Sequence, residues 1–177
     1  MNNLSYNKFS MTNILIFITL LIYAIQNNIQ YGDIYLGLNI YFFENGFYYQ
    51  LLSTMFAHGG IAHILMNMFV LYQFGNMIEM AIGKARFLSL YFIGGILTSI
   101  GTLAYMYFTS NWANVVGASG AISVLLGWFA LKDIEQRKGI FVWIILISFA
   151  PLLLGLPVAW YSHLIGFALG WIMGFII

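Results

Sequence analysis

Apolar residues run along this chain in long blocks that short polar segments separate. A helix needs about 20 predominantly apolar residues to cross a bilayer, and most of the blocks approach this length. The pattern therefore predicts six membrane helices in a single domain over residues 1–177. They cover residues 11–27, 57–80, 86–108, 118–131, 139–156 and 159–177. The long connection at residues 28–56 is rich in Tyr and Phe, which is typical of a segment lying in the headgroup region.

The composition supports an all-α polytopic membrane protein. Hydrophobic residues make up 62% of the chain and charged residues only 6%, whereas a soluble domain carries about a quarter charged residues. The net charge of +1 argues against nucleic acid as a partner. Because the chain contains no cysteine, it has no disulfide, no thiolate nucleophile and no thiolate metal ligand. We expect no cofactor.

The basic residues predict how the helices are oriented in the membrane. They fall before the first helix, between the second and third, or between the fourth and fifth: Lys8, Lys84, Arg86, Lys132, Arg137 and Lys138. The connections on the other side contain no Lys or Arg, so the positive-inside rule places them outside and both termini in the cytoplasm. The first block could be a signal peptide, but its lone upstream Lys8 and the lack of a cleavage site favour a spanning helix.

Unusual polar residues in three of the predicted helices fall at a similar depth. Ser119 begins the fourth helix, and His163 lies one turn inside the sixth. His63 and Asn67 lie in the outer part of the second helix. Polar groups are costly in hydrocarbon and are typical of functional sites there. Their common depth predicts one water-accessible cavity that opens to the outer face.

Small residues follow two of these polar groups at helical spacing. One stripe consists of Ser119, Ser123 and Gly127. The other consists of His163, Gly166, Gly170 and Gly174. Such stripes let helices approach closely in lipid, and alone they indicate only helix packing. Since a reactive group heads each stripe, we expect the packing to bring Ser119 Oγ within hydrogen-bond reach of His163.

A serine beside a histidine is the minimal apparatus for acyl transfer. The imidazole takes the serine proton as a general base and later returns it to the leaving amine. The carboxylates lie in the outer loop or toward the cytoplasm, where none can orient His163: Asp33, Glu44, Glu79, Asp133 and Glu135. We therefore predict a Ser119–His163 dyad whose imidazole is oriented by packing alone.

His63 and Asn67 lie four residues apart, on one face of the second predicted helix. Singly, each is typical of an ordinary interior contact, a satisfied histidine or a helix–helix hydrogen bond. Together, and level with Ser119, they are candidate donors to the oxyanion of a tetrahedral intermediate, beside the Ser119 backbone N–H. His58, near the start of the same segment, is a weaker candidate that we expect to hold the outer loop.

The ordered motifs resemble those of the rhomboid intramembrane serine proteases. His58-x4-His63-x3-Asn67 is followed by Gly-x-Ser-Gly at 117–120 and then by His163-x2-Gly166-x3-Gly170. Gly75-x3-Glu79-x3-Gly83 also resembles the end of the family's second helix. The resemblance runs from about residue 50 to residue 177.

This resemblance implies a six-helix rhomboid-like bundle with Ser119 as nucleophile and His163 as general base. It implies that His63 and Asn67 form the oxyanion hole. It further implies cleavage of peptide bonds in or near the transmembrane segments of membrane-protein substrates, which enter between the second and fifth helices. Pro151, Gly155 and Pro157 suit a movable gate there, although an ordinary helix end and turn explains them equally.

Two positions depart from the family pattern. Tyr49-Gln50 stands where the outer loop often has a Trp-Arg pair, so the resemblance does not specify how that loop is anchored. Ser123 stands where some bacterial members carry a tyrosine stacked on the histidine, so other neighbours must hold His163. Without an extra domain or a seventh helix, the chain resembles a minimal bacterial type, for which we expect the inner (cell) membrane as location.

Two other functions are compatible with some of these residues. His58, His63 and His163 could bind zinc in a metalloprotease or transporter, although the chain has no His-Glu-x-x-His motif. A catalytically silent relative that binds and escorts membrane helices would need neither Ser119 nor His163. The natural substrate, the cleavage preference, any regulation and the oligomeric state stay open.

Overall fold

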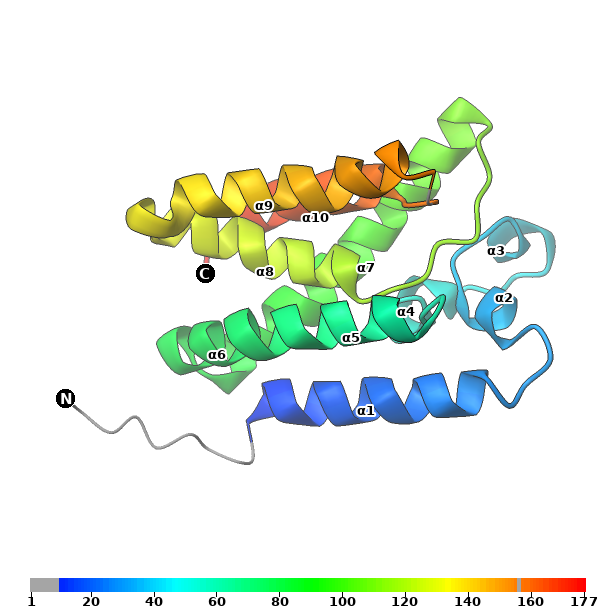
Figure 1. Cartoon of the computed structure of the whole chain (residues 1–177), viewed down its shortest axis with the longest axis horizontal. Helices are drawn as coiled ribbons and strands as arrows, with labels where there is room; N and C mark the ends of the chain where they lie inside the picture. The colour runs from blue at the N-terminus through cyan, green and yellow to red at the C-terminus, as the bar shows by residue number, and fades with distance from the viewer. Residues whose placement is uncertain (1–9, 156) are drawn as a thin grey trace.

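The computed structural model describes residues 10–155 and 157–177, and these residues form a helical bundle (Figure 1). Within them, one antiparallel bridge between Leu38 and Val115 is the sole strand-like pairing. The helices are α1 (Met11–Gln26), α2 (Gly32–Leu36), α3 (Tyr41–Glu44), α4 (Gln50–Ser53), α5 (Ile61–Val70), the π-helical η1 (Leu71–Gly75), α6 (Asn76–Ile82), α7 (Lys84–Thr109), α8 (Ser119–Lys132), α9 (Ile134–Leu153) and α10 (Trp160–Met173).

Three of the described helical segments are long and apolar enough to cross a membrane. They are Ile61–Ile82, which joins α5, η1 and α6 in one rod, Lys84–Thr109, and Ile134–Leu153. The helices α1 and α8 are apolar but shorter. Large apolar side chains such as Leu65 and Phe69 point outward from α5, as expected where hydrocarbon rather than water surrounds a helix.

Several helix ends differ from the predicted bounds. α5 begins at Ile61 rather than at 57, because Gly59 and the extended Gly60 precede it. α9 begins at Ile134 rather than at 139, since the Asp133 side chain accepts a hydrogen bond from the Gln136 N–H and caps a polar first turn. It ends at Leu153 rather than at 156, and α10 ends at Met173 rather than at 177. A hydropathy pattern contains no information on the Asp133 cap or on the extended Gly60, so it misplaced these helix ends.

The connection between α1 and α5 folds into the short helices α2, α3 and α4 at one end of the bundle (Figure 1). The fully buried Gln50 anchors it, because its amide donates to the carbonyls of Ile34 and Tyr35 and its oxygen accepts from the Asn39 N–H. The Asn39 amide in turn donates to Asn114 Oδ1 in the α7–α8 connection. The uncharged Gln50 amide thus anchors this loop, whose mode of anchoring the family resemblance did not specify.

The start of α1 is tied to α6 by a buried carboxylate. Glu79 accepts hydrogen bonds from the backbone N–H groups of Met11 and Thr12, at 2.8 and 2.9 Å, and from the Thr12 hydroxyl at 2.9 Å. These N–H groups have no partner inside α1, and the positive end of the helix dipole favours an anion there. Glu79 therefore serves as the cap of a neighbouring helix.

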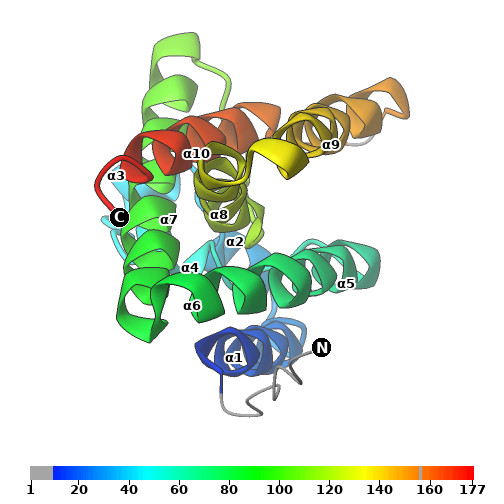
Figure 2. The ribbon, with the colours of Figure 1, turned by 90° about the vertical axis from the view of Figure 1, so that its left-hand side faces the viewer.

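α8 occupies the centre of the bundle, enclosed by α5, α7, α9 and α10 (Figure 2). Its residues from Ala121 to Ala130 are all buried. Added Cβ atoms at Gly127, Gly166 and Gly170 would overlap backbone carbonyls of the facing helix, those of Phe167, Gly120 and Val124. The backbones of α8 and α10 thus touch along the two predicted small-residue stripes, which confirms that the stripes face each other.

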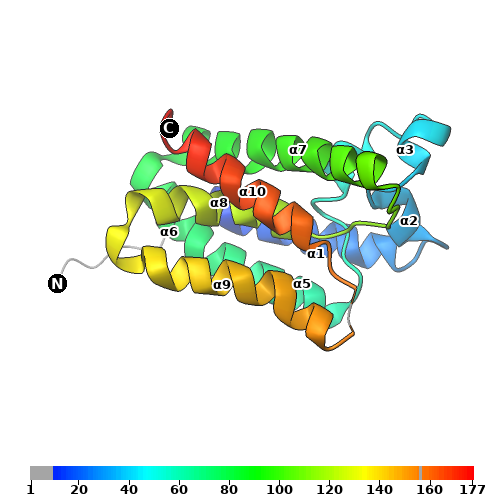
Figure 3. The ribbon, with the colours of Figure 1, turned by 90° about the horizontal axis from the view of Figure 1, so that it is seen from above.

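α9 is the least embedded of the long helices and runs along one flank of the bundle (Figure 3). Its buried residues form a single stripe at four-residue spacing: Ile140, Ile144 and Ser148. Its other large side chains, Leu153 among them, are mostly exposed. A helix held by so narrow a face has few contacts to lose when it moves.

We predict that Gly170→Ala destabilises the protein, because the new methyl group would overlap the Val124 carbonyl, which the helix backbone holds in place. Overpacking of this kind costs about 1–3 kcal/mol in free energy of unfolding. Gly139→Ala in α9 is the matched control, since no heavy atom lies within 4 Å of its added Cβ. Denaturation in detergent micelles measures both variants, and an equal loss in the two would contradict the close α8–α10 contact.

Candidate active site

Ser119 is the first residue of α8, and the backbone before it is tightly constrained. Gly117 has a φ of +129°, which side chains rarely allow. A Cβ at Gly117 would also lie 2.8 Å from His63 Cε1 and 2.9 Å from His63 Nε2. The Gly117 N–H donates to the Thr54 carbonyl at 3.0 Å. Only glycine fits at position 117, because the backbone has a positive φ there and the His63 ring leaves no room for a side chain.

The structure brings Ser119 and His163 into direct contact. His163 Nε2 lies 2.9 Å from Ser119 Oγ, across the α8–α10 interface. His163 is buried and Ser119 is half-buried. Close to this pair, the two backbones meet at Gly166, three residues after His163, where an added Cβ would overlap the Gly120 carbonyl. The predicted stripe packing thus sets this distance.

The prediction that packing alone orients His163 is wrong. The other ring nitrogen, Nδ1, lies 3.3 Å from the hydroxyl oxygen of Ser148 on α9. Ser148 is fully buried and sits in an otherwise apolar stretch. Serine is common in membrane helices, where it often bonds to its own backbone, so nothing in the local sequence distinguishes this position. The contact depends on how α9 packs against α10, which the sequence pattern did not reveal.

The predicted oxyanion donors, His63 and Asn67, both lie on α5. The point where a Gly117 Cβ would stand is 2.9 Å from His63 Nε2 and 3.5 Å from Ser119 Oγ, so the His63 ring adjoins the serine. Asn67 lies one turn further along α5 and donates one amide hydrogen to the His63 carbonyl at 2.9 Å. Its second amide hydrogen is available to another acceptor. His63 is thus in place beside Ser119, while Asn67 stays bonded to its own helix.

His58 lies outside α5 and holds the backbone just before Ser119. Its Nδ1 is 3.1 Å from the Phe56 carbonyl and its Nε2 is 3.4 Å from the Ala118 N–H. A carbonyl can only accept and an N–H can only donate, so these partners require the neutral ring with its proton on Nδ1. Burial, with a smaller effect of nearby His63, lowers the pKa of His58 to about 4, which favours the same neutral form.

Gln26, at the end of α1, fixes His58 in turn and was missed from the sequence. Its amide donates to the His58 carbonyl at 2.8 Å and accepts from the His58 N–H at 3.0 Å. Both groups are buried. The chain Gln26–His58–Ala118 therefore connects α1 to the residue before Ser119. A polar residue that ends an apolar helix is an ordinary sequence feature, so only the tertiary contact identifies it.

The arrangement offers little to a metal ion. The ring nitrogens of His58 and of His163 are already engaged by backbone or hydroxyl partners. In the described residues, no three His, Cys, Asp or Glu side chains converge in a way that could hold a metal. A zinc site built from the three histidines would have to break these hydrogen bonds first.

Comparison with known proteins identifies the family. A model of the rhomboid domain matches residues 45–177, which is most of the chain. The chain belongs to the rhomboid family. It is 33% identical over 143 residues to the putative rhomboid protease YdcA of Bacillus subtilis, covering 75% of this chain and 68% of that protein. As a rhomboid with several long apolar helices, it is an integral membrane protein.

Other relatives are longer than this rhomboid. It is 39% identical over 137 residues to RHOMBOID-like protein 4 of Arabidopsis thaliana, which covers 73% of this chain but only 34% of the plant protein. It is 34% identical over 93 residues to the rhomboid protease GluP of Bacillus subtilis, covering 52% of this chain and 17% of that protein. The chain thus spans about a third of the plant relative.

We predict that Gln26→Leu destabilises this rhomboid, because it leaves the buried N–H and carbonyl of His58 without their side-chain partner. An unpaired buried polar group costs about 1–3 kcal/mol. Asn27→Leu is the control, since Asn27 is exposed and bonds only within α1; exposed changes usually stay within about 0.5 kcal/mol. Denaturation curves that coincide for the two variants would show that Gln26 does not hold this region.

Proposed function

We propose that this rhomboid is an intramembrane serine endopeptidase that hydrolyses peptide bonds in or near the transmembrane segments of other membrane proteins. The observation that carries the proposal is the 2.9 Å contact between Ser119 Oγ and His163 Nε2. A serine hydroxyl bonded to an imidazole is an activated nucleophile. Relatives named as rhomboid proteases support the same reaction.

In the proposed acylation step, Ser119 Oγ attacks the scissile carbonyl carbon while His163 Nε2 takes the hydroxyl proton. The carbonyl oxygen becomes an oxyanion. His163 then gives its proton to the leaving amine, the C–N bond breaks, and an acyl ester on Ser119 forms. In the second step His163 deprotonates a water molecule, which attacks the ester and releases the new carboxyl end with Ser119 restored.

The proposed oxyanion hole uses donors from two elements. The Ser119 N–H belongs to the first turn of α8, where backbone N–H groups have no partner within the helix and the helix dipole favours negative charge. The His63 imidazole and the Ser119 hydroxyl both approach the position that a Gly117 Cβ would take, so the ring lies near the serine. Asn67, with one amide hydrogen still available, can add a third donor once substrate is bound.

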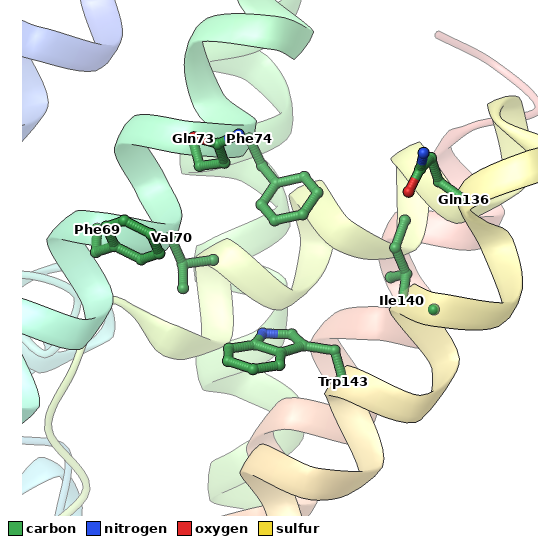
Figure 4. Close-up of a pocket in the computed structure, with 8 residues that line it drawn as sticks. Phe69, Val70, Gln73, Phe74, Gln136, Ile140 and Trp143 are labelled. Carbon is green, nitrogen blue, oxygen red and sulfur yellow. The ribbon is translucent and has the colours of Figure 1, made fainter.

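We further propose that substrate approaches between α5 and α9. A cavity of about 290 Å³ lies between the first half of α9 and the segment formed by the end of α5 and η1, and the Ser119 and His163 side chains do not line it (Figure 4). It is lined mainly by apolar side chains: Phe69, Val70, Gln73, Phe74, Gln136, Gly139, Ile140 and Trp143. A spanning helix has no free backbone donors or acceptors, so an apolar recess suits its side chains. α9 contains Pro151 and ends before Gly155, which has a φ of +71°. Both residues weaken a helix and suit an α9 end that moves to admit substrate.

The proposed topology has six membrane helices with both termini in the cytoplasm of a bacterial cell. Lys84, Arg86, Lys132, Arg137 and Lys138 flank the α6–α7 and α8–α9 turns, which lie at one end of the bundle (Figure 1). Lys8 falls outside the described residues. The opposite end carries α2 to α4 and lacks Lys and Arg. The positive-inside rule then has the Ser119 site open toward the outer face of the cell membrane.

The test is cleavage of a single-pass model substrate in proteoliposomes. We expect the native chain to cut, and Ser119→Ala and His163→Ala to lose about 10³-fold or more in rate, because each removes a partner of one proton-transfer unit. His63→Ala should lose about 10²–10³-fold if it stabilises the oxyanion. The control is Ser89→Ala, which removes a half-buried serine that bonds only within α7 and should cut at the native rate.

The outcomes of this experiment separate the alternatives. Cleavage that persists in folded Ser119→Ala would overturn the serine mechanism. Activity that a chelator abolishes would favour a metal enzyme. Binding of the model substrate by the native chain without any cleavage would favour a rhomboid that escorts membrane helices.

A further inference from the structure

We infer that Ser148 is a positioning residue for His163 and takes the place that a carboxylate holds in a catalytic triad. This inference rests on the proposed function of Ser119 and His163. Its basis is the 3.3 Å contact between Ser148 Oγ and His163 Nδ1, made by a side chain with no exposed surface. The carboxylates of the described residues lie in the outer connection, at the α1 cap or near the α8–α9 turn.

The proposed base role fixes which tautomer of the ring can work, and both contacts of the ring are compatible with it. To take the Ser119 proton, Nε2 must present its lone pair to Ser119 Oγ, so the ring proton must be on Nδ1. A proton on Nδ1 then points at Ser148 Oγ, which has lone pairs to accept it. The other tautomer would place the ring proton between Nε2 and Ser119 and leave the serine without a base. In the productive form Ser148 Oγ accepts the bond from Nδ1–H, so the ring is paired on both sides while Nε2 serves as the base.

The same bond stabilises the ring after it accepts the proton. The imidazolium is a stronger donor than the neutral ring, so the Nδ1–H to Ser148 bond strengthens as His163 becomes charged. A hydroxyl stabilises this charge less than a carboxylate would. It also avoids burying a second ionised group, whose desolvation is costly at this depth.

The position of Ser148 in α9 supports a dedicated role. The buried stripe of this helix consists of Ile140, Ile144 and Ser148, so one hydroxyl interrupts an otherwise aliphatic face where it meets His163. An aliphatic side chain there would leave His163 Nδ1 unpaired inside the protein, at a cost. The cavity of Figure 4 is lined by a different part of α9, the segment from Gln136 to Trp143, so the role of Ser148 does not depend on that cavity.

The test is the rate at which a fluorophosphonate modifies Ser119. In this reaction Ser119 Oγ bonds to phosphorus, fluoride leaves, and His163 takes the serine proton. It depends on the oriented base but requires no large substrate to enter. We expect Ser148→Ala to slow the labelling about 10- to 100-fold, the size of effect that misplacing a reacting group produces. Cleavage of the model substrate should lose kcat by a similar factor with KM little changed.

Two variants make the result specific. Ser99→Ala removes a buried serine of α7 that bonds only to the Gly95 carbonyl, and it should label at the native rate. Ser148→Thr keeps the hydroxyl and should retain most of that rate. Denaturation midpoints show whether each variant is folded.

The outcomes also separate this inference from the proposed function. If Ser148 only packs α9 against the bundle, Ser148→Ala loosens that helix, and labelling stays at the native rate or becomes faster, which overturns the positioning role. If Ser148→Thr is as slow as Ser148→Ala, the hydroxyl is not what matters and the inference is wrong. If the native chain itself is not labelled at Ser119, the serine mechanism fails rather than the role of Ser148.

Discussion

The close backbone contact between α8 and α10 is the feature on which the rest of the site depends. Gly127 and Gly170 bring each helix against a carbonyl of the other, with no room for a side chain between them. Apolar side chains gain nothing from leaving lipid, so association in a membrane relies on such packing and on polar contacts. Here the packing places Ser119 and His163 at hydrogen-bond distance near the first residues of the two helices.

Buried side-chain hydrogen bonds between elements hold the remaining helices in place. Glu79 joins α6 to the start of α1, Gln26 joins the end of α1 to His58, and Ser148 joins α9 to His163. Each joins segments that are distant in the sequence and replaces hydrogen bonds that water would otherwise make. The consequence is that Ser119 is constrained from two directions, by the loop before it through Ala118 and by the imidazole beside it.

Much of this could be predicted from the sequence, because membrane helices follow from hydropathy and the stripes follow from helical spacing. The contact between the two stripes could be predicted from the helical period and from the tendency of small residues to pack helices together in lipid. The start of α9 was misplaced because its polar first turn is stabilised by an Asp133 cap rather than by lipid. Gln26 and Ser148 were missed because their partners are 32 and 15 residues away, in other elements, and neither residue type is unusual where it stands.

The central claim is that Ser119 and His163 act as one unit, and alkylation by a peptide chloromethyl ketone tests it most directly. The serine adds to the carbonyl of such a ketone, and an imidazole nitrogen then displaces chloride from the chloromethyl carbon, so the histidine adduct reports both groups at once. Peptide mapping by mass spectrometry should find the adduct on His163, with none on His58 or His63, and none at all in the Ser119→Ala variant. An adduct on another histidine, or one on His163 that forms equally well without the Ser119 hydroxyl, would contradict the account.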